Sequence, residues 1–111
     1  MLVFNIADPH YSMKMQILES LRTVIDPELH INIIDMGLVY EIQPDTNNHM
    51  IHIKMTLSTS FCPMGDSIVS GTKNCLERFF PDFSPEVELV WEPQWNYDLI
   101  SEEGLRLLKG I

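Results

Sequence analysis

The stretch from Met55 to Asp66 holds the residues most able to do chemistry, because it places a thiol at the mouth of an expected helix. Cys62 precedes Pro63, and proline is favoured at the first position of a helix. Unpaired backbone N–H groups at a helix N-terminus stabilise an anion, so we expect the Cys62 pKa to lie below that of a free thiol. Metal ligation and nucleophilic attack both require the thiolate. The alternative is that Cys62 packs as a small apolar residue at a helix cap.

Several residues with hydroxyl side chains precede Cys62 in the sequence. Thr56, Ser58 and Thr59 could supply hydrogen bonds to the sulfur or to a bound group. Cys75 is different, because it falls inside the expected helix near its apolar stripe, and we expect it in the core. With only two cysteines and no secretion signal, both thiols are expected to be reduced.

A second group of chemically capable residues is acidic. Asp26, Glu28 and Asp35 lie on a predicted loop between a helix and a strand. Carboxylates in such a loop could coordinate a hard metal ion or act as acid and base. The alternative is an ordinary solvated loop in which Asp26 caps a turn.

Two tryptophans bracket a proline after the last expected strand. Trp91 continues the apolar alternation of that strand, so we expect it in the core. Trp95 is predicted to be partly exposed, as a surface for a partner protein or as a lid over the Cys62 loop.

The elements that must position these residues are predicted from periodicity, caps and breakers. Helices are expected from Ser12 to about Ile25, from just after Cys62 to Pro81, and after Ser101; strands are expected at 38–43, 51–57 and 87–91. The predicted fold is a single α+β domain in the order helix, strand, strand, helix, strand, helix. The helices pack on a small three-stranded sheet.

Length and charge limit the function further. The 111 residues form one expected domain, residues 1–111, with residues 1–11 as a loose leader. Sixteen acidic against seven basic residues give a net charge of −9, which disfavours nucleic acid and anionic membranes as partners. No basic segment precedes an apolar run at the N-terminus, so a cytoplasmic location is expected.

Four motifs in a fixed order resemble one family, the iron-sulfur cluster assembly domain of SufT-like and PaaD-like maturation factors and of the cytosolic iron-sulfur targeting subunit. The motifs are Asp26-Pro27-Glu28 with the stretch 31–40, Met55-Thr56-Leu57 through Cys62-Pro63-Met64, the stretch 90–95, and Ile100-Ser101-Glu102-Glu103-Gly104. The resemblance runs from about Met15 to Lys109.

The resemblance implies an accessory factor that assembles or delivers iron-sulfur clusters to client proteins, often as a homodimer. Cys62 matches the reactive cysteine of the family, and Asp26 and Glu28 match its acidic signature. Clusters are held by about four ligands, so one chain cannot hold a cluster through Cys62 alone. A second subunit, a small thiol, a partner or the oxygens of Asp26 and Glu28 would have to supply the rest.

Two other functions stay open. The first is a protein adaptor without chemistry, working through strand-edge or helix contacts in a larger complex. The second is a thiol enzyme, for which the sequence offers no convincing general base.

Overall fold

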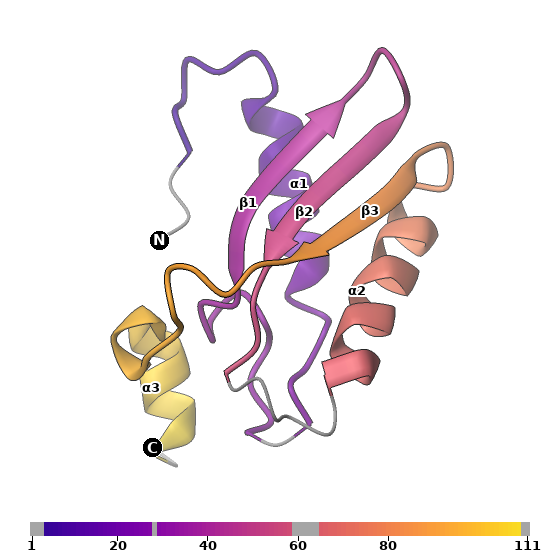
Figure 1. Ribbon diagram of the computed structural model, residues 1–111. Coiled ribbons are helices and arrows are strands. Elements are labelled where there is room, and N and C mark those ends of the chain that lie inside the picture. The colour runs from indigo at the N-terminus through magenta and orange to yellow at the C-terminus, as the bar shows by residue number, and fades with distance from the viewer. Residues whose placement is uncertain (1–3, 28, 59–64, 110–111) are drawn as a thin grey trace.

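The computed structural model describes residues 4–27, 29–58 and 65–109. Within them, three α-helices and three strands follow one another in the predicted order (Figure 1). They are α1 (Tyr11–Leu21), β1 (Val39–Asp45), β2 (Met50–Met55), α2 (Gly65–Phe79), β3 (Ser84–Leu89) and α3 (Glu102–Leu108), with a 3-10 turn, η1 (Tyr97–Leu99), before α3. The predicted α+β class is confirmed.

The three strands form one sheet in the order β1-β2-β3. β1 and β2 are an antiparallel hairpin, whose turn is held by Asp45 Oδ1, which accepts hydrogen bonds from the N–H groups of Asn47 and Asn48 at 3.0 and 3.1 Å. β3 runs parallel to β2, and α2 is the crossover that a parallel pair requires. The C-terminal ends of β2 and β3, at Met55 and Leu89, therefore lie side by side.

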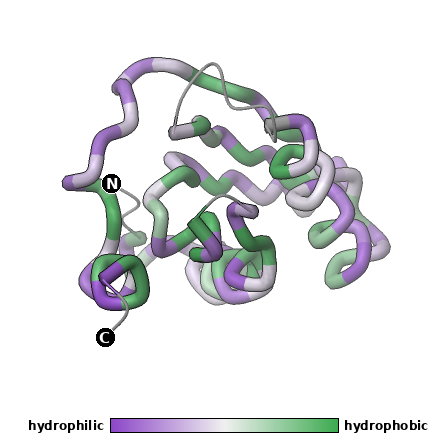
Figure 2. The backbone as a smooth tube through the Cα atoms, turned by 90° about the horizontal axis from the view of Figure 1, so that it is seen from below, coloured by the Kyte–Doolittle hydropathy of each residue, from purple (hydrophilic) through white to green (hydrophobic). Residues whose placement is uncertain are grey.

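The core lies between the sheet and the two long helices. α1 packs against β1 and α2, and α2 packs against β3. Ile51, Ile53 and Met55 alternate along β2 and are fully buried, as the period-two pattern predicts. Figure 2 shows hydrophobic and hydrophilic residues alternating along the strands.

The opposite face of the sheet is polar. Lys54 Nζ lies 3.5 Å from Glu41 Oε2, and His52 Nε2 lies 3.1 Å from Glu88 Oε1. Each pair joins neighbouring strands, and its members are more than a third exposed. Such pairs contribute little to stability, so this face is a solvated surface rather than a packing layer.

α1 ends at Leu21, earlier than the predicted end near Ile25. The N–H groups of Thr23 and Val24 donate to the carbonyls three residues back, at 3.1 and 3.0 Å, which tightens the chain into a 3-10 type end. Ile25 then forms an isolated antiparallel bridge with Asn32. The helix ends before the apolar periodicity does, because Ile25 pairs with Asn32 instead of continuing the helix.

β3 begins at Ser84 rather than at the predicted Val87. The Ser84 N–H donates to His49 O at 2.8 Å, so the pairing starts where β2 does. Beyond the end of β3, the Trp91 side chain is 46% exposed. The prediction that Trp91 lies in the core is therefore wrong, because the strand has ended before this residue.

Residues 4–10 lie in turns before α1. Lys14 Nζ contacts Asp8 Oδ2 at 2.7 Å, and Phe4 packs against the core. The proposed leader and the domain bounds stay predictions. Among the residues described, no helix combines the length and the apolar character needed to cross a membrane.

Candidate functional site

The stretch from Met55 to Asp66, for which the sequence predicted the chemistry, begins at the end of the sheet where β2 and β3 finish. β2 continues into Thr56 and Ser58, and the described part of α2 begins at Gly65 at this same end (Figure 1). Parallel pairing of β2 and β3 across α2 produces this arrangement, because a crossover helix starts where the preceding strand stops.

Three of the predicted site residues, Cys62, Thr59 and Glu28, lie outside the described residues. The predictions of a lowered Cys62 pKa, of a hydroxyl at Thr59 and of a carboxylate at Glu28 therefore stay predictions. The predicted helix start at Pro63 also falls there.

Thr56 is enclosed by the fold. It is 1% exposed, its N–H donates to Leu38 O at 2.8 Å, and its Oγ1 donates to Leu57 O at 3.5 Å. Ser58, two residues further on, is half-buried. The Thr56 hydroxyl thus has a backbone partner, and its predicted contact with a sulfur or a bound group stays a prediction, as does that of Ser58.

Asp26 closes a turn. Its N–H donates to Ile31 O at 2.9 Å, its carbonyl accepts from His30 N–H at 2.8 Å, and its Oδ1 accepts from Leu29 N–H at 3.4 Å. The residue is 1% exposed, and His30 adopts the left-handed conformation at φ 60°. These contacts fit the turn-capping alternative for Asp26, and they leave its role toward a metal as a prediction.

Asp35 is the hub of a hydrogen-bonded group that joins three separate segments. Arg22 Nη1 lies 3.1 Å from both carboxylate oxygens, Asn32 Nδ2 donates to Oδ2 at 2.7 Å, and Ser101 Oγ donates to Oδ1 at 2.8 Å. The Asp35 side chain is 9% exposed. We call these four residues, Arg22, Asn32, Asp35 and Ser101, the Asp35 cluster.

Opposing effects act on the Asp35 pKa. Burial raises it, but the hydrogen bonds from Asn32, Ser101 and Arg22, together with the positive charge of Arg22, outweigh burial and hold the pKa below its ordinary value of 3.8. Asp35 is therefore an ionised carboxylate near neutral pH, with both oxygens already occupied. These contacts hold the loop in place, and the predicted supporting role of Asp35 toward a metal or cluster stays a prediction.

The same cluster docks α3 onto the loop before β1. The Ser101 N–H donates to Asp35 O at 2.8 Å, and Ser101 Oγ accepts from Gly104 N–H at 3.0 Å as the helix N-cap. Gly37, at φ 75°, lies where an added Cβ would overlap the carbonyl of Leu99. A glycine is needed at position 37 both for its backbone conformation and for this close approach.

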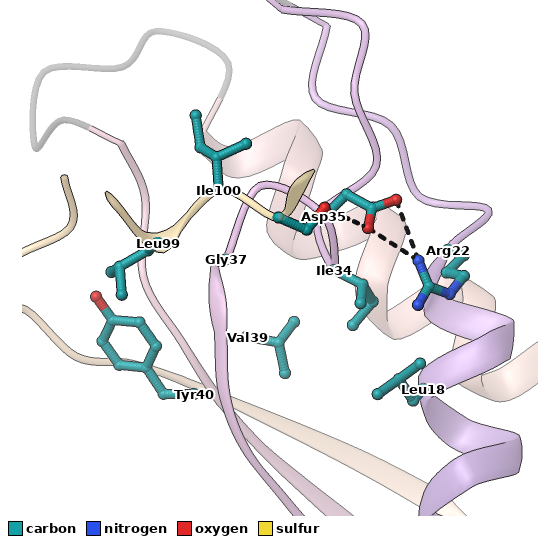
Figure 3. Close-up of a pocket in the computed structure, with 10 residues that line it drawn as sticks. Leu18, Arg22, Ile34, Asp35, Gly37, Val39, Tyr40, Leu99 and Ile100 are labelled. Carbon is teal, nitrogen blue, oxygen red and sulfur yellow. Dashed lines mark hydrogen bonds and ion pairs between the residues drawn. The ribbon is translucent and has the colours of Figure 1, made fainter. Parts of the chain in front are cut away.

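A small, mainly apolar cavity of about 270 Å³ opens beside the cluster. Figure 3 shows the Arg22–Asp35 pair in the same view as Leu18 of α1, Val39 of β1 and Leu99 of η1. Of the residues predicted for the site, only Asp35 lines this cavity among those described. The cavity lies on the β1 side of the sheet end where β2 finishes, because Val39 pairs with Met55.

The tyrosine at the rim of this cavity fastens the segment after β3. Tyr40 Oη donates to Pro93 O at 2.8 Å. Burial and the nearby negative charge of Glu92 raise the pKa of Tyr40 above its ordinary value, so it is a neutral donor near neutral pH.

Trp95 is half-buried and anchored. Its Nε1 donates to Met36 O at 2.7 Å, and its ring packs on Tyr97 with centroids 5.4 Å apart. A buried indole needs such a partner, and the loop carbonyl supplies it. The predicted partner surface at Trp95 stays a prediction, while Trp91 exposes its own ring to solvent.

The prediction for Cys75 is confirmed. The residue is 7% exposed, and its Sγ donates to Ser20 O at 3.1 Å, where α2 meets α1. No group of three or more His, Cys, Asp or Glu residues that could hold a metal ion occurs in the described part of the chain. Cys75 is thus a packing residue.

The fold and the site together define a class of small α+β domains. Its features are one parallel β2-α2-β3 crossover and an acidic loop that is hydrogen-bonded to the start of the C-terminal helix. The profile of the family described as "Iron-sulfur cluster assembly protein" matches residues 14–88. The chain belongs to this family.

Relatives of known name agree. The Fe-S protein maturation auxiliary factor YitW of Bacillus subtilis (strain 168) is 37% identical over 90 residues, which are 81% of this chain and 87% of that protein. The Fe-S protein maturation auxiliary factor SufT of Staphylococcus aureus (strain USA300) is 40% identical over 78 residues, which are 70% of this chain and 88% of that protein.

Solved structures share the fold. A domain of unknown function (DUF59) from Bacillus anthracis superposes with a TM-score of 0.83 at 34% identity, covering 88% of this chain and 92% of that one. A conserved hypothetical protein from Thermotoga maritima superposes with a TM-score of 0.73 at 35% identity, covering 88% and 94%.

Sequence reasoning missed that Arg22 belongs to the Asp35 cluster. The local sequence predicts that Arg22 is a solvated residue on the polar side of a helix, and that Ser101 is a helix cap and nothing more. The available signal is weak: an Asn32 and an Asp35 in one loop favour local hydrogen bonds, but nothing local points to a distant arginine.

Proposed function

We propose that the protein is an accessory factor that assembles iron-sulfur clusters or delivers them to client proteins, and that it acts through the Cys62 thiol. The family match over residues 14–88, with relatives named as Fe-S protein maturation auxiliary factors, carries the proposal. The iron or the cluster is cargo, and no covalent change of a substrate is required. The role is therefore non-catalytic.

Cys62 is the proposed contact with iron because the other thiol is committed elsewhere. Cys75 Sγ donates to a backbone carbonyl inside the interface between α1 and α2. Withdrawing Cys75 would remove one of the donors to the Ser20 carbonyl, which also accepts from the Thr23 N–H and hydroxyl groups, and would open the core. One remaining thiol per chain fits transient handling rather than permanent storage of a cluster.

The missing ligands would come from outside the single chain. A second copy in a homodimer, a small thiol or a client cysteine could complete the coordination. Asp35 is a poor contributor, because both its oxygens already accept hydrogen bonds. Asp26 and Glu28 are the carboxylates proposed to support the site, and Thr56, Ser58 and Thr59 the hydroxyls.

The first test is anaerobic reconstitution with iron and sulfide, followed by iron and sulfide analysis and visible absorption. Wild type, Cys62→Ser and the matched control Cys75→Ser are compared. The proposal expects a cluster in the wild type and in Cys75→Ser, and its loss in Cys62→Ser. A cluster retained by Cys62→Ser would contradict a role for this thiol.

The second candidate function is an adaptor that brings client and assembly proteins together without contacting iron. In the described part of the chain β3 pairs with β2 alone and Leu89 is exposed, which favours this function. Complementation in cells that lack the native copy separates the two functions: full maturation of client clusters by Cys62→Ser would favour the adaptor. A thiol enzyme is the weaker alternative, and turnover of a thioester or ester that is lost in Cys62→Ser would be its evidence.

A further inference from the structure

β3 leaves main-chain groups open along one side. The Ser84 N–H donates to the carbonyl of His49, just before β2, at 2.8 Å, and the Val90 N–H donates to the carbonyl of Met55, the last residue of β2, at 2.9 Å. In a parallel ladder alternate residues bond to the neighbour, so the intervening residues turn their N–H and C=O groups away from β2. Among the residues described, β3 pairs with β2 only, and it lies at the border of the sheet (Figure 1).

The position of Pro85 limits where another strand could add. Pro85 is one of the outward-turned residues and has no N–H, so the beginning of this edge lacks a donor. Val87 and Leu89 keep theirs, and no described residue outside the strands accepts from them. The open donors are therefore concentrated in the C-terminal half of β3.

The side chains along this edge are more exposed than a buried strand would show. Leu89 is 39% exposed and Trp91, just beyond it, is 46% exposed. Ser84, Glu86 and Glu88 are also exposed. An apolar residue that keeps this much surface beside open main-chain groups has the features of a β-augmentation site.

The negative charge along β3 favours a partner strand that carries basic residues. Glu86 makes no ion pair with a described residue, whereas the half-exposed Glu88 has His52 Nε2 at 3.1 Å and Lys54 as its register partner on β2. A second copy added edge to edge in the antiparallel sense would bring these carboxylates toward their own equivalents, and like charges across a strand pair are destabilising. A strand carrying Lys or Arg would gain where a second copy would lose.

We propose that the free edge of β3 is a docking site for an extended segment of a partner protein in which basic residues alternate with apolar ones. The segment adds as a fourth strand, bonds to Val87 and Leu89, and places its basic side chains beside Glu86 and Glu88. The identity of the partner as a client or assembly protein rests on the proposed function.

The β3 edge ends close to the part of the chain that leads to the predicted site residues. Leu89 pairs with Met55, the last residue of β2, from which the chain runs on toward Thr56 and Ser58. A segment that follows the edge toward its C-terminal end is therefore led to the sheet end where the site residues are predicted.

The probe is a synthetic peptide, acetyl-Lys-Val-Lys-Val-Lys-Val-amide, titrated into the full-length 15N-labelled protein. The expected result is a set of chemical-shift changes along β3, together with slowed hydrogen exchange of the Val87 and Leu89 amides. The peptide with Glu in place of every Lys is expected not to bind. Equal binding of both peptides, or changes elsewhere on the surface without protection of these amides, would overturn the proposal.

Glu86→Lys and Glu77→Lys form a matched pair, because each reverses one exposed charge that makes no ion pair with a described residue, and only the first lies on β3. Glu86→Lys is expected to weaken peptide binding about tenfold, and Glu77→Lys less than about twofold. Equal weakening would mean that net charge alone attracts the peptide, which would overturn the site.

Two further measurements separate the remaining outcomes. If sedimentation shows a concentration-dependent dimer whose formation protects Val87 and Leu89 without peptide, the edge is a contact between copies and the proposal fails. Cys62→Ser is expected to bind the peptide like the wild type. If the wild type binds the peptide but takes up no cluster on reconstitution with iron and sulfide, the docking site stands and the proposed role of Cys62 fails.

Discussion

The Asp35 cluster and the β3 edge are both acidic, yet they differ in how their polar groups are used. In the cluster, a carboxylate that is 9% exposed accepts hydrogen bonds from Asn32 of its own loop and from Arg22 and Ser101 on other segments. On the edge, Glu86 is exposed without an ion pair among the described residues, and the main-chain groups of Val87 and Leu89 turn away from β2. Satisfied polar groups hold a fold together, whereas open ones are available to a partner.

The strongest way to break this comparison is to remove the loop geometry on which the cluster depends. Gly37→Val would place a β-branched residue at φ 75° and drive its Cβ into the Leu99 carbonyl. Backbone strain and overpacking together should lower the free energy of unfolding by about 3 kcal/mol. Urea denaturation measures this, and a variant as stable as the wild type would show that α3 does not dock as described.

A smaller loss is expected when the hub of the cluster is removed. Asp35→Ala should lower the free energy of unfolding by about 2 kcal/mol, because hydrogen bonds to a charged group are lost while Arg22 keeps some contact with water. Glu19→Ala is the control, since it removes the other, exposed partner of Arg22 and should change stability by less than about 0.5 kcal/mol. Equal losses in both variants would contradict a structural role for Asp35.

The pH dependence sharpens the same contrast. The folded-state pKa of Asp35 is lowered, so its carboxylate stabilises the fold above its ordinary pKa of 3.8, and this contribution is lost as the pH falls through the lowered value. Between about pH 5 and about pH 2, Asp35→Asn should therefore lose less stability than the wild type. Denaturation series at several pH values test this, and parallel curves would refute it.

The smallest stability effect is expected on the edge. Glu86→Lys changes an exposed residue, so the free energy of unfolding should stay within about 0.5 kcal/mol of the wild type while peptide binding weakens. Loss of stability comparable with that of Asp35→Ala would place the edge among the structural regions and remove the contrast.

Some of the fold could be predicted because its signals are local. The alternation of Ile51, Ile53 and Met55 predicted the buried face of β2, and Ser101 with its following glutamates predicted the cap of α3. Predictions failed where a contact from elsewhere overrode the pattern. Ile25 left the helix to pair with Asn32, and Trp91 fell outside the strand whose alternation it continued.

The candidate site divides in the same way. Cys62, Asp26 and Glu28 were selected by residue type and by resemblance, and Cys75 was assigned to the core from its place in a helix. The role of Asp35 could not be derived, because its partners Arg22 and Ser101 lie on other elements and each has an adequate local explanation.

By itself, the sequence determined the class of fold, the order of its elements and the family, because periodicity, caps and motif order are properties of neighbouring residues. Only the tertiary structure decided which acidic residues are satisfied and which are open. Burial and hydrogen bonding depend on segments far apart in the chain. The local sequence around a loop carboxylate is the same whether its partner in the fold is an arginine or only water.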